Sequence, residues 1–485
     1  MASFEELRKI RIQKLNLLEK AGMNPYPSSS KMDYYISDLL KNFDEISQKG
    51  DTFLVGRIMS IRGQGGLMFF NFNDGTGLFQ GLLKKDEMDE KVFNLFQDTV
   101  DIGDFIQVNG NLFVTKRGEK TIQVKDWKML AKSLRPLPEK WHGLQDEDER
   151  FRKRYLDIIS NSEAKEAVIK RAIFWKAMRN FLSDKNFMEV DTPILENTAG
   201  GAEAKPFITH YNAYDMDVYM RISPELWLKR LMVAGFPKVF EIGRVFRNEG
   251  VDAEHLQDYS HMEFYWAFAD YNDGMKFIEE MYKYIAEKTF GTLKFKIKGF
   301  DIDLGAEWKR YDYVETIQKM TGVDILKASL KEIEDKLREF KVEYDKKGFN
   351  LNRAIDTLWK YCRKQIGGPG FLVNVPVMME PLAKRMESNK NLVERFQVIL
   401  AGSEMGKGFS ELNDPIDQLS RFTDQAKLRA EGDEEAQMMD GDFVEALEYG
   451  MPPTFGFGLS ERLFSFLMDK PIRECQIFPF MRPRG

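Results

Sequence analysis

Every second residue is apolar in several short runs between Thr52 and about Leu130, and this period of two is typical of β-strands. Segments rich in glycine, asparagine and aspartate, such as residues 73–77, separate the runs and are typical of hairpin turns. The pattern predicts about five strands within about eighty residues, which is enough to close a small β-barrel. We place this barrel at residues 51–135.

The apolar positions change to a helical period after residue 160. Ser160 and Glu163 have the spacing of a capping box, and Pro193 prevents the helix from continuing to that point. Spacings of three and four predict a buried stripe on this helix, made of Val168, Ala172, Trp175, Met178 and Leu182.

Longer β-like segments follow around 239–247, 260–268 and 396–412, and charge-rich helical sequence fills about 326–365. This order predicts an antiparallel sheet with helices and a helical insertion. Such a domain is α+β rather than a doubly wound parallel fold.

Shifts in composition mark the remaining boundaries. Residues 136–150 contain prolines followed by a run of charges, so we interpret them as a linker that precedes a second domain at 151–485. Residues 1–50 form a helical extension in which basic and apolar positions are interleaved. A solvated amphipathic helix explains that pattern at least as well as RNA binding does.

The composition narrows the class of protein. Of the 485 residues, 43% are hydrophobic and 31% are charged, as in a globular protein. No apolar run approaches the roughly 20 residues that span a bilayer, and the N-terminus lacks an export signal, so we expect no membrane partner and a cytoplasmic location. Cys362 and Cys475 are too few and too far apart for a disulfide framework or a zinc site. The net charge of −6 argues against a DNA-coating protein, so any contact with nucleic acid must be local.

Strand parity sorts the segment around 260–268 into two faces. His261, Glu263 and Tyr265 share one face and large apolar residues share the other, so the polar face can line a pocket. Arg247 ends the preceding strand, and its planar donors suit a phosphate. On this motif alone, a surface pair between Arg247 and Glu249 is the better interpretation.

Two later segments favour the pocket. Lys407, Phe409 and Glu411 share one strand face, next to glycines that allow close approach of a ligand. Residues 454–464 form a glycine-punctuated strand that runs into an apolar helix, with Arg462 at the junction.

In this order, the segments resemble the three signature motifs of class II aminoacyl-tRNA synthetases. Residues 187–193 are similar to motif 1, the strand Phe240–Arg247 with its loop and return strand to motif 2, and Gly456–Arg462 to motif 3. The resemblance to the lysine-specific family covers nearly the whole chain. It includes Asn24–Pro27, Trp141–Leu144, Arg154–Asp157, Glu225–Leu231 and Glu411–Pro415.

The family implies a barrel of the OB type, lysine activation by ATP with Mg²⁺, transfer of lysine to the 3′ end of lysine tRNA, and a homodimer. It gives the catalytic roles to Arg247, on the α-phosphate and the substrate carboxylate, and to Arg462, on the γ-phosphate. The implied ATP site contains Arg247, Glu249, His255, Tyr259, Glu404 and Arg462, and the implied metal ligands are Glu404 and Glu411.

The implied lysine site provides acids for two ammonium groups and an apolar wall between them. Gly201 and Glu225 take the α-amino group, whereas Glu263, Tyr265 and Glu411 take the ε-ammonium. The complete implied set is Gly201, Glu225, Arg247, Glu263, Tyr265, Lys407, Phe409 and Glu411.

The implied anticodon site lies on the barrel. By its parity, Phe69 is opposite to Met68, Phe70 and Phe72 and can stack on a base of a uridine-rich loop. A core aromatic is an equally good interpretation of Phe69 taken alone. The implied polar contacts are Arg62, Gln80 and Glu119.

The chain departs from the family at several positions. It has Lys407 where asparagine is usual and Gln397 where an acid is usual, and Leu256 and Gln257 replace an asparagine–proline pair. Motif 3 is one residue short, which a bulge or an earlier helix start must absorb. A catalytically impaired RNA-binding protein and an enzyme that lysylates a protein are the alternatives, although paralogues of the second kind lack the barrel.

Overall fold

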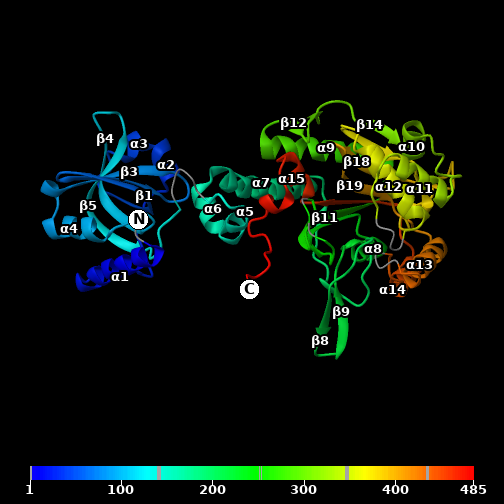
Figure 1. Cartoon of the computed structure of the whole chain (residues 1–485), viewed down its shortest axis with the longest axis horizontal. Helices are drawn as coiled ribbons and strands as arrows, with labels where there is room; N and C mark the ends of the chain where they lie inside the picture. Colours follow the sequence, from blue (N-terminus) through cyan, green and yellow to red (C-terminus); the bar gives the residue numbers. More distant parts are fainter. Residues whose placement is uncertain are drawn as a thin grey trace. The chain divides into compact units, whose positions relative to one another are not determined.

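The structure is a computed structural model that describes residues 3–138, 144–250, 252, 254–344, 349–432 and 436–484, apart from the side chain of Gln64. The chain divides into two compact units, Met1–Asp146 and Glu147–Gly485 (Figure 1). The segment Trp141–Gly143, which contributed to the family resemblance, lies outside the described residues. Among the described helices, none is both long and apolar enough to cross a membrane.

The first unit begins with helices. Ser3 and Glu6 form a capping box at the start of α1 (Phe4–Lys20). Arg11 on this helix donates to the Ser133 and Ile102 carbonyl oxygens, which ties the helix to the barrel within the same unit. The other helices of the unit are α2 (Ile36–Lys41), α3 (Phe43–Ile46), η1 (Lys85–Glu87) and α4 (Glu90–Thr99).

Five strands close into a barrel in the order β1-β2-β3-β5-β4. Met68, Phe70 and Phe72 are buried in the barrel core, whereas Phe69 is half-buried on the opposite face of its strand. The predicted barrel is therefore confirmed. Its strands are β1 (Thr52–Gln64), β2 (Leu67–Asn73), β3 (Leu78–Lys84), β4 (Phe105–Val114) and β5 (Lys120–Ala131).

The second unit begins with α5 (Glu147–Arg152), α6 (Arg154–Ser160) and α7 (Ser162–Asp184). The predicted capping box at Ser160 is wrong, because Ser160 ends α6 and the Asn161 side chain caps α7. The predicted buried stripe is also partly wrong, since Ala172 is exposed and the long helix packs through Phe174 instead. The apolar residues of this helix form two sets with helical spacing, one through Phe174 and one through Trp175. Periodicity alone does not tell which of the two sets is buried, and this explains the error.

An eight-stranded sheet forms the centre of the second unit, and most of its neighbouring strands are antiparallel. The predicted strand around 396–412 is a hairpin that turns at Ala401 and Gly402, both at positive φ. The strands in spatial order are β14 (Lys309–Asp312), β15 (Gly370–Val373), β18 (Arg395–Leu400), β19 (Ser403–Ser410), β20 (Thr454–Ser460), β11 (Asp258–Ala267), β10 (Lys238–Phe246) and β6 (Met188–Glu189).

One face of this sheet carries the main core. Met262 and Phe264 of β11 pack with Phe174 of α7 and with Met281 of α9 (Tyr271–Phe290). The opposite face carries His261, Glu263 and Tyr265, as parity predicts, and it is left for the site. The predicted α+β fold is therefore confirmed.

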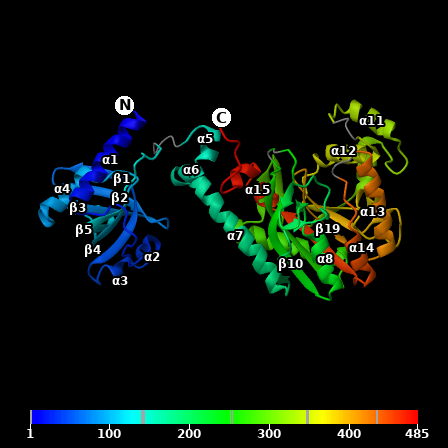
Figure 2. The same ribbon diagram turned by 90° about the horizontal axis from the view of Figure 1, so that it is seen from below.

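The remaining elements cover the sheet or extend from it, and α11 to α14 gather at one end of the unit (Figure 2). The helices are α8 (Glu225–Val233), α10 (Tyr313–Thr321), α11 (Leu330–Glu339), α12 (Leu351–Arg363), η2 (Val377–Met379), α13 (Pro415–Ala430), α14 (Gly441–Glu448), α15 (Arg462–Leu467) and η3 (Ile472–Cys475). The strands are β7 (Leu195–Glu196), β8 (Ile208–Tyr211), β9 (Met216–Met220), β12 (Lys294–Ile297), β13 (Phe300–Asp303), β16 (Val375–Pro376) and β17 (Leu392–Val393).

Candidate active site

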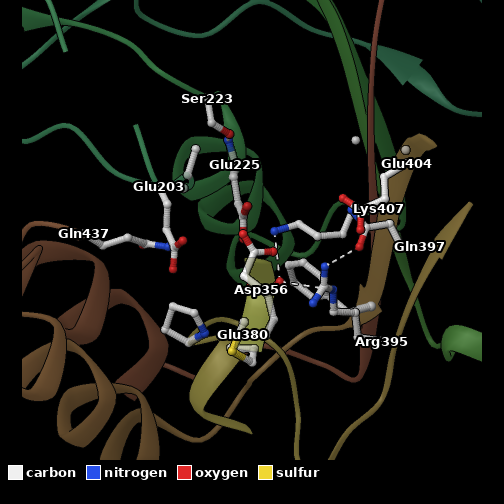
Figure 3. A pocket seen from close by; sticks show the side chains of 18 of the residues that line it. Glu203, Ser223, Glu225, Asp356, Glu380, Arg395, Gln397, Glu404, Lys407 and Gln437 are labelled. Atoms are coloured by element: carbon white, nitrogen blue, oxygen red, sulfur yellow. Dashed lines mark hydrogen bonds and ion pairs between the residues drawn. The ribbon is translucent and has the colours of Figure 1, made fainter. Parts of the chain in front are cut away.

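A cavity of about 500 Å³ lies over the polar face of the large sheet (Figure 3). Strands β11, β18, β19 and β20 provide residues of its lining, and α8, α12 and α13 provide others. The predicted site residues that line the cavity are Gly201, Glu225, Arg247, Tyr259, Glu263, Tyr265, Glu404, Lys407 and Phe409.

The register of the sheet sets the floor of this cavity. Gln397, Lys407, Gly458, Glu263 and Glu241 are direct neighbours across five strands, from β18 to β10. The glycine in the middle of this row has no side chain to fill the space above the sheet. A ligand can therefore lie between Lys407 on one side and Glu263 on the other.

Glu263 is a buried carboxylate with three partners. Its Oε1 accepts from the Ser223 hydroxyl at 2.6 Å and lies 3.1 Å from the His261 Nε2, and its Oε2 accepts from the Tyr265 hydroxyl at 3.0 Å. Burial alone would raise its pKa, but these hydrogen bonds and the imidazole hold the pKa below its ordinary value. Glu263 is therefore held as an anion that can attract an ammonium group.

A second pair of acids shares one internal lysine. The Lys229 Nζ lies 2.5 Å from the Glu225 Oε1 and 2.5 Å from the Glu411 Oε2, and none of the three side chains is more than 7% exposed. Burial raises the pKa of Glu225 to about 7 and also raises the pKa of Glu411 well above its ordinary value. One ammonium does not fully balance two buried carboxylates, so this part of the pocket favours a further positive charge.

The arginine end of the cavity lies at the start of the loop after β10. The Arg247 guanidinium lies 5.6 Å from the Tyr259 ring, and its Nε is buried without a hydrogen-bond partner among the described residues. Glu249 and His255 are exposed on the loop, where the His255 ring contacts Asp252. The structure therefore brings Arg247 and Tyr259 to the cavity but does not bring Glu249 or His255 into its described lining.

Arg462 lies at the edge of this end. It donates to the Glu404 carbonyl oxygen at 3.3 Å and forms an ion pair with Glu254 from the loop. Burial alone would raise the pKa of Glu254, but Arg462 and Lys298 hold it below its ordinary value. Strand β20 pairs with β11 without a bulge as far as Ser460, and α15 starts at Arg462.

Whether a magnesium ion fits the cavity depends on the carboxylates near Arg247 and Arg462. The Glu404 Oε1 accepts from the Trp359 indole at 2.6 Å, and Glu404 lines the cavity. Within the described part of the chain, no group of three His, Cys, Asp or Glu residues is placed to hold a metal ion. One carboxylate fits magnesium only together with phosphates of a nucleotide, which is a common arrangement for this ion.

The prediction that Glu411 shares a metal ion with Glu404 stays a prediction, and the structure places the two residues in different surroundings. Glu404 stands at the start of β19 and Glu411 just beyond its end. An extended chain rises about 3.3 Å per residue, which separates the two residues by roughly 20 Å. Glu411 instead pairs with Lys229 and is only 1% exposed.

Three cavity residues around Lys407 form a connected cluster with it, which we call the Glu380 cluster: Glu380, Arg395, Gln397 and Lys407 (Figure 3). The Glu380 Oε2 lies 2.9 Å from the Lys407 Nζ and 3.4 Å from the Arg395 Nε. Arg395 also donates to the Gln397 Oε1 at 2.7 Å. Burial alone would raise the pKa of Glu380, but Lys407 and Arg395 hold it below its ordinary value.

The predicted anticodon residues lie on the outer face or the rim of the barrel. Arg62 of β1 is directly opposite Phe69 of β2. Gln80 of β3 is opposite Asn71, two residues from Phe69, and accepts from the Thr121 hydroxyl at 3.0 Å. Glu119 is exposed in the turn before β5. Arg62, Phe69 and Gln80 therefore share one face of adjacent strands.

The sequence interpretation missed Ser223, Lys229 and Glu380 as parts of the site. Glu225 and Lys229 have the i,i+4 spacing of a helical ion pair, which was a usable signal. Ser223 precedes that helix, and Glu380 follows a short 3₁₀ helix in irregular chain, so neither had a pattern to reveal it.

Comparisons with known proteins agree with this geometry. Residues 146–482 match the family described as tRNA synthetases class II (D, K and N), and residues 53–130 match the OB-fold nucleic acid binding domain. A lysine–tRNA ligase of Thermotoga maritima is 43% identical over 99% of this chain and 97% of its own length. Lysine–tRNA ligases of Carboxydothermus hydrogenoformans and a Thermoanaerobacter species are 44% and 45% identical, over 99% of this chain and 98% and 97% of their own lengths. The chain belongs to the lysine–tRNA ligase family of class II aminoacyl-tRNA synthetases.

Proposed function

We propose that this protein activates lysine with ATP and transfers it to the 3′ end of lysine tRNA. The observation that carries the proposal is one cavity with buried acids at one end and Arg247 at the other. Lysine has a positive charge at each of its two amino groups and a reactive carboxylate. Such a cavity offers acids to the ammonium groups and cations to the carboxylate and to the phosphates of ATP.

In the first step, an oxygen of the lysine carboxylate attacks the α-phosphorus of ATP, and the bond to the bridging oxygen of pyrophosphate breaks. No side chain has to take a proton, so the protein contributes position and charge. Arg247 would hold the carboxylate and the α-phosphate together, which its unpartnered buried Nε supports. Glu263 and Tyr265 would receive the ε-ammonium over Gly458, with Glu225 and Gly201 near the α-amino group.

At the phosphate end, Arg462 would bind the terminal phosphate after releasing Glu254. Magnesium would be held by Glu404 together with phosphate oxygens, and when bound it would neutralise part of their charge. Glu249 and His255 would reach the nucleotide only if the loop that carries them moved over the cavity, because both are exposed.

In the second step, a hydroxyl of the terminal ribose of tRNA attacks the activated carbonyl carbon, and AMP leaves. The barrel would select the tRNA by its anticodon. Phe69 on the outer face, with Arg62 and Gln80 beside it, offers an aromatic ring and polar groups to an unpaired base. The exposed Glu119 would contact a neighbouring base.

The protein would act as a homodimer through motif 1. Strand β6 is the edge of the large sheet, and Met188 on it is 43% exposed. Ile194 and Leu195, a few residues further along, are also exposed. An open edge with apolar side chains is suited to a partner surface.

Lysine-dependent exchange of pyrophosphate into ATP, without tRNA, tests the proposal. We expect exchange with lysine and none with aspartate, whose side-chain carboxylate would meet the acids of the pocket. Absence of exchange, with tRNA binding retained, would favour the catalytically impaired RNA-binding protein. Exchange without any aminoacylation of lysine tRNA would instead favour lysylation of another acceptor.

A further inference from the structure

We propose that Lys407 is a fixed cation that takes the place of one bound magnesium ion during lysine activation. The inference rests on the proposed function, because it assigns a charge to the reaction centre of that activity. It concerns the Glu380 cluster, which the reaction as described above does not use.

The position of Lys407 is set by the sheet. It faces Gln397 on one side and Gly458 on the other, and Glu263 is the next residue across the sheet. Its side chain is 39% exposed, whereas that of its partner Glu380 is only 4% exposed. The ammonium is thus anchored by a buried carboxylate and still accessible from the cavity that contains Arg247.

The charges of the Glu380 cluster leave an excess of one positive charge. Arg395 and Lys407 are cations, Glu380 is one anion, and Gln397 is neutral. The family resemblance implies an acid at position 397 and an asparagine at position 407, and with those two residues the same cluster would carry one negative charge. The difference of two charges equals the charge of one magnesium ion.

The oxygen atoms of the cluster are poorly placed for a metal ion. The Gln397 Oε1 accepts a hydrogen bond from Arg395 at 2.7 Å, and Glu380 is shared between two cations. A divalent cation at Gln397 would lie beside an ammonium and a guanidinium, which repel it. These residues therefore do not fit a second metal ion, and they fit an anionic oxygen of the substrate carboxylate or the α-phosphate instead.

A count of bound manganese tests the inference without turnover. Electron paramagnetic resonance on the full chain, with lysine and α,β-methylene-ATP, measures the number of Mn²⁺ ions bound per active site. We expect the double variant Gln397→Glu/Lys407→Asn to bind one more Mn²⁺ than the native protein. The control Lys360→Asn removes another lysine that lines the cavity and should leave the count unchanged.

Pyrophosphate exchange gives a second readout. Lys407→Asn should lower the exchange rate at least tenfold when magnesium only matches ATP, excess magnesium should restore part of it, and Lys407→Arg should keep most of it. An equal manganese count in native and double-variant proteins, or a magnesium dependence that Lys407→Asn leaves unchanged, would overturn the inference. If native protein showed no exchange at any magnesium concentration, the proposed function would fail, while the manganese count would still decide the role of Lys407.

Discussion

Replacing Gly456 by alanine should weaken lysine binding. A Cβ at this position would overlap the Glu411 carboxylate and would lie 2.6 Å from the Tyr265 Cε1. Both neighbours are buried, and Gly456 is bonded between β11 and β19. The methyl group therefore displaces the side chains that hold the ammonium end of the pocket.

The size of the effect follows from the cost of overpacking, which is about 1–3 kcal/mol for an extra methyl group in a filled core. If the overpacking weakens lysine binding by this amount, the lysine dissociation constant should rise by about 5- to 150-fold. If the strain destabilised the fold instead, the melting temperature would fall by about 1–2 °C per kcal/mol, and lysine binding would change little.

Gly367→Ala is the control in the same unit, because Gly367 is not among the described residues that line the cavity. Its Cβ would lie 3.0 Å from the Phe300 Cδ1, so it introduces strain away from the ligand. Titration calorimetry with lysine and a thermal melt should be measured for both variants. Equal lysine constants for Gly456→Ala and native protein, or an effect of Gly367→Ala on lysine binding as large as that of Gly456→Ala, would refute the reasoning.

Three further predictions concern the acids and the barrel. Glu263→Gln should weaken lysine binding by about 2 kcal/mol or more, which raises the Michaelis constant for lysine in pyrophosphate exchange and leaves that for ATP nearly unchanged. An unaffected Michaelis constant for lysine would show that other acids bind the ammonium group. Because the pKa of Glu225 is raised to about 7, lysine affinity should fall as the pH drops below 7, by at most tenfold per pH unit for one proton, and a flat calorimetric profile from pH 6 to 8.5 would contradict this. Phe69→Ala should weaken tRNA binding by about 1–3 kcal/mol and leave the rate of pyrophosphate exchange and the melting temperature unchanged. A lower melting temperature with unchanged tRNA affinity would show that Phe69 belongs to the barrel core.

The sequence predicted the elements whose pattern is local. The alternation around 260–268 placed His261, Glu263 and Tyr265 on one face because a strand has a fixed period of two. The aromatic positions of the barrel followed for the same reason, with Phe70 inside and Phe69 outside.

Contacts between distant segments were not predictable in this way. Lys229 binds Glu411 across a wide gap in sequence, and Glu380 meets Lys407 from irregular chain. The metal role of Glu411 came from the family resemblance and not from strand parity, and it stays a prediction, since Glu411 pairs with Lys229 in this structure. Parity gives a direction for each side chain but no distance between two of them.

The central place of β20 limits where this chain can change in length. The strand is hydrogen-bonded to β11 on one side and to β19 on the other, so losing a residue within it would turn every later side chain to the wrong face. Glu461 already has helical angles, and α15 starts immediately after it. Deletions can therefore survive at this junction but not within the strand, and evolutionary variation in the length of motif 3 should be confined to it.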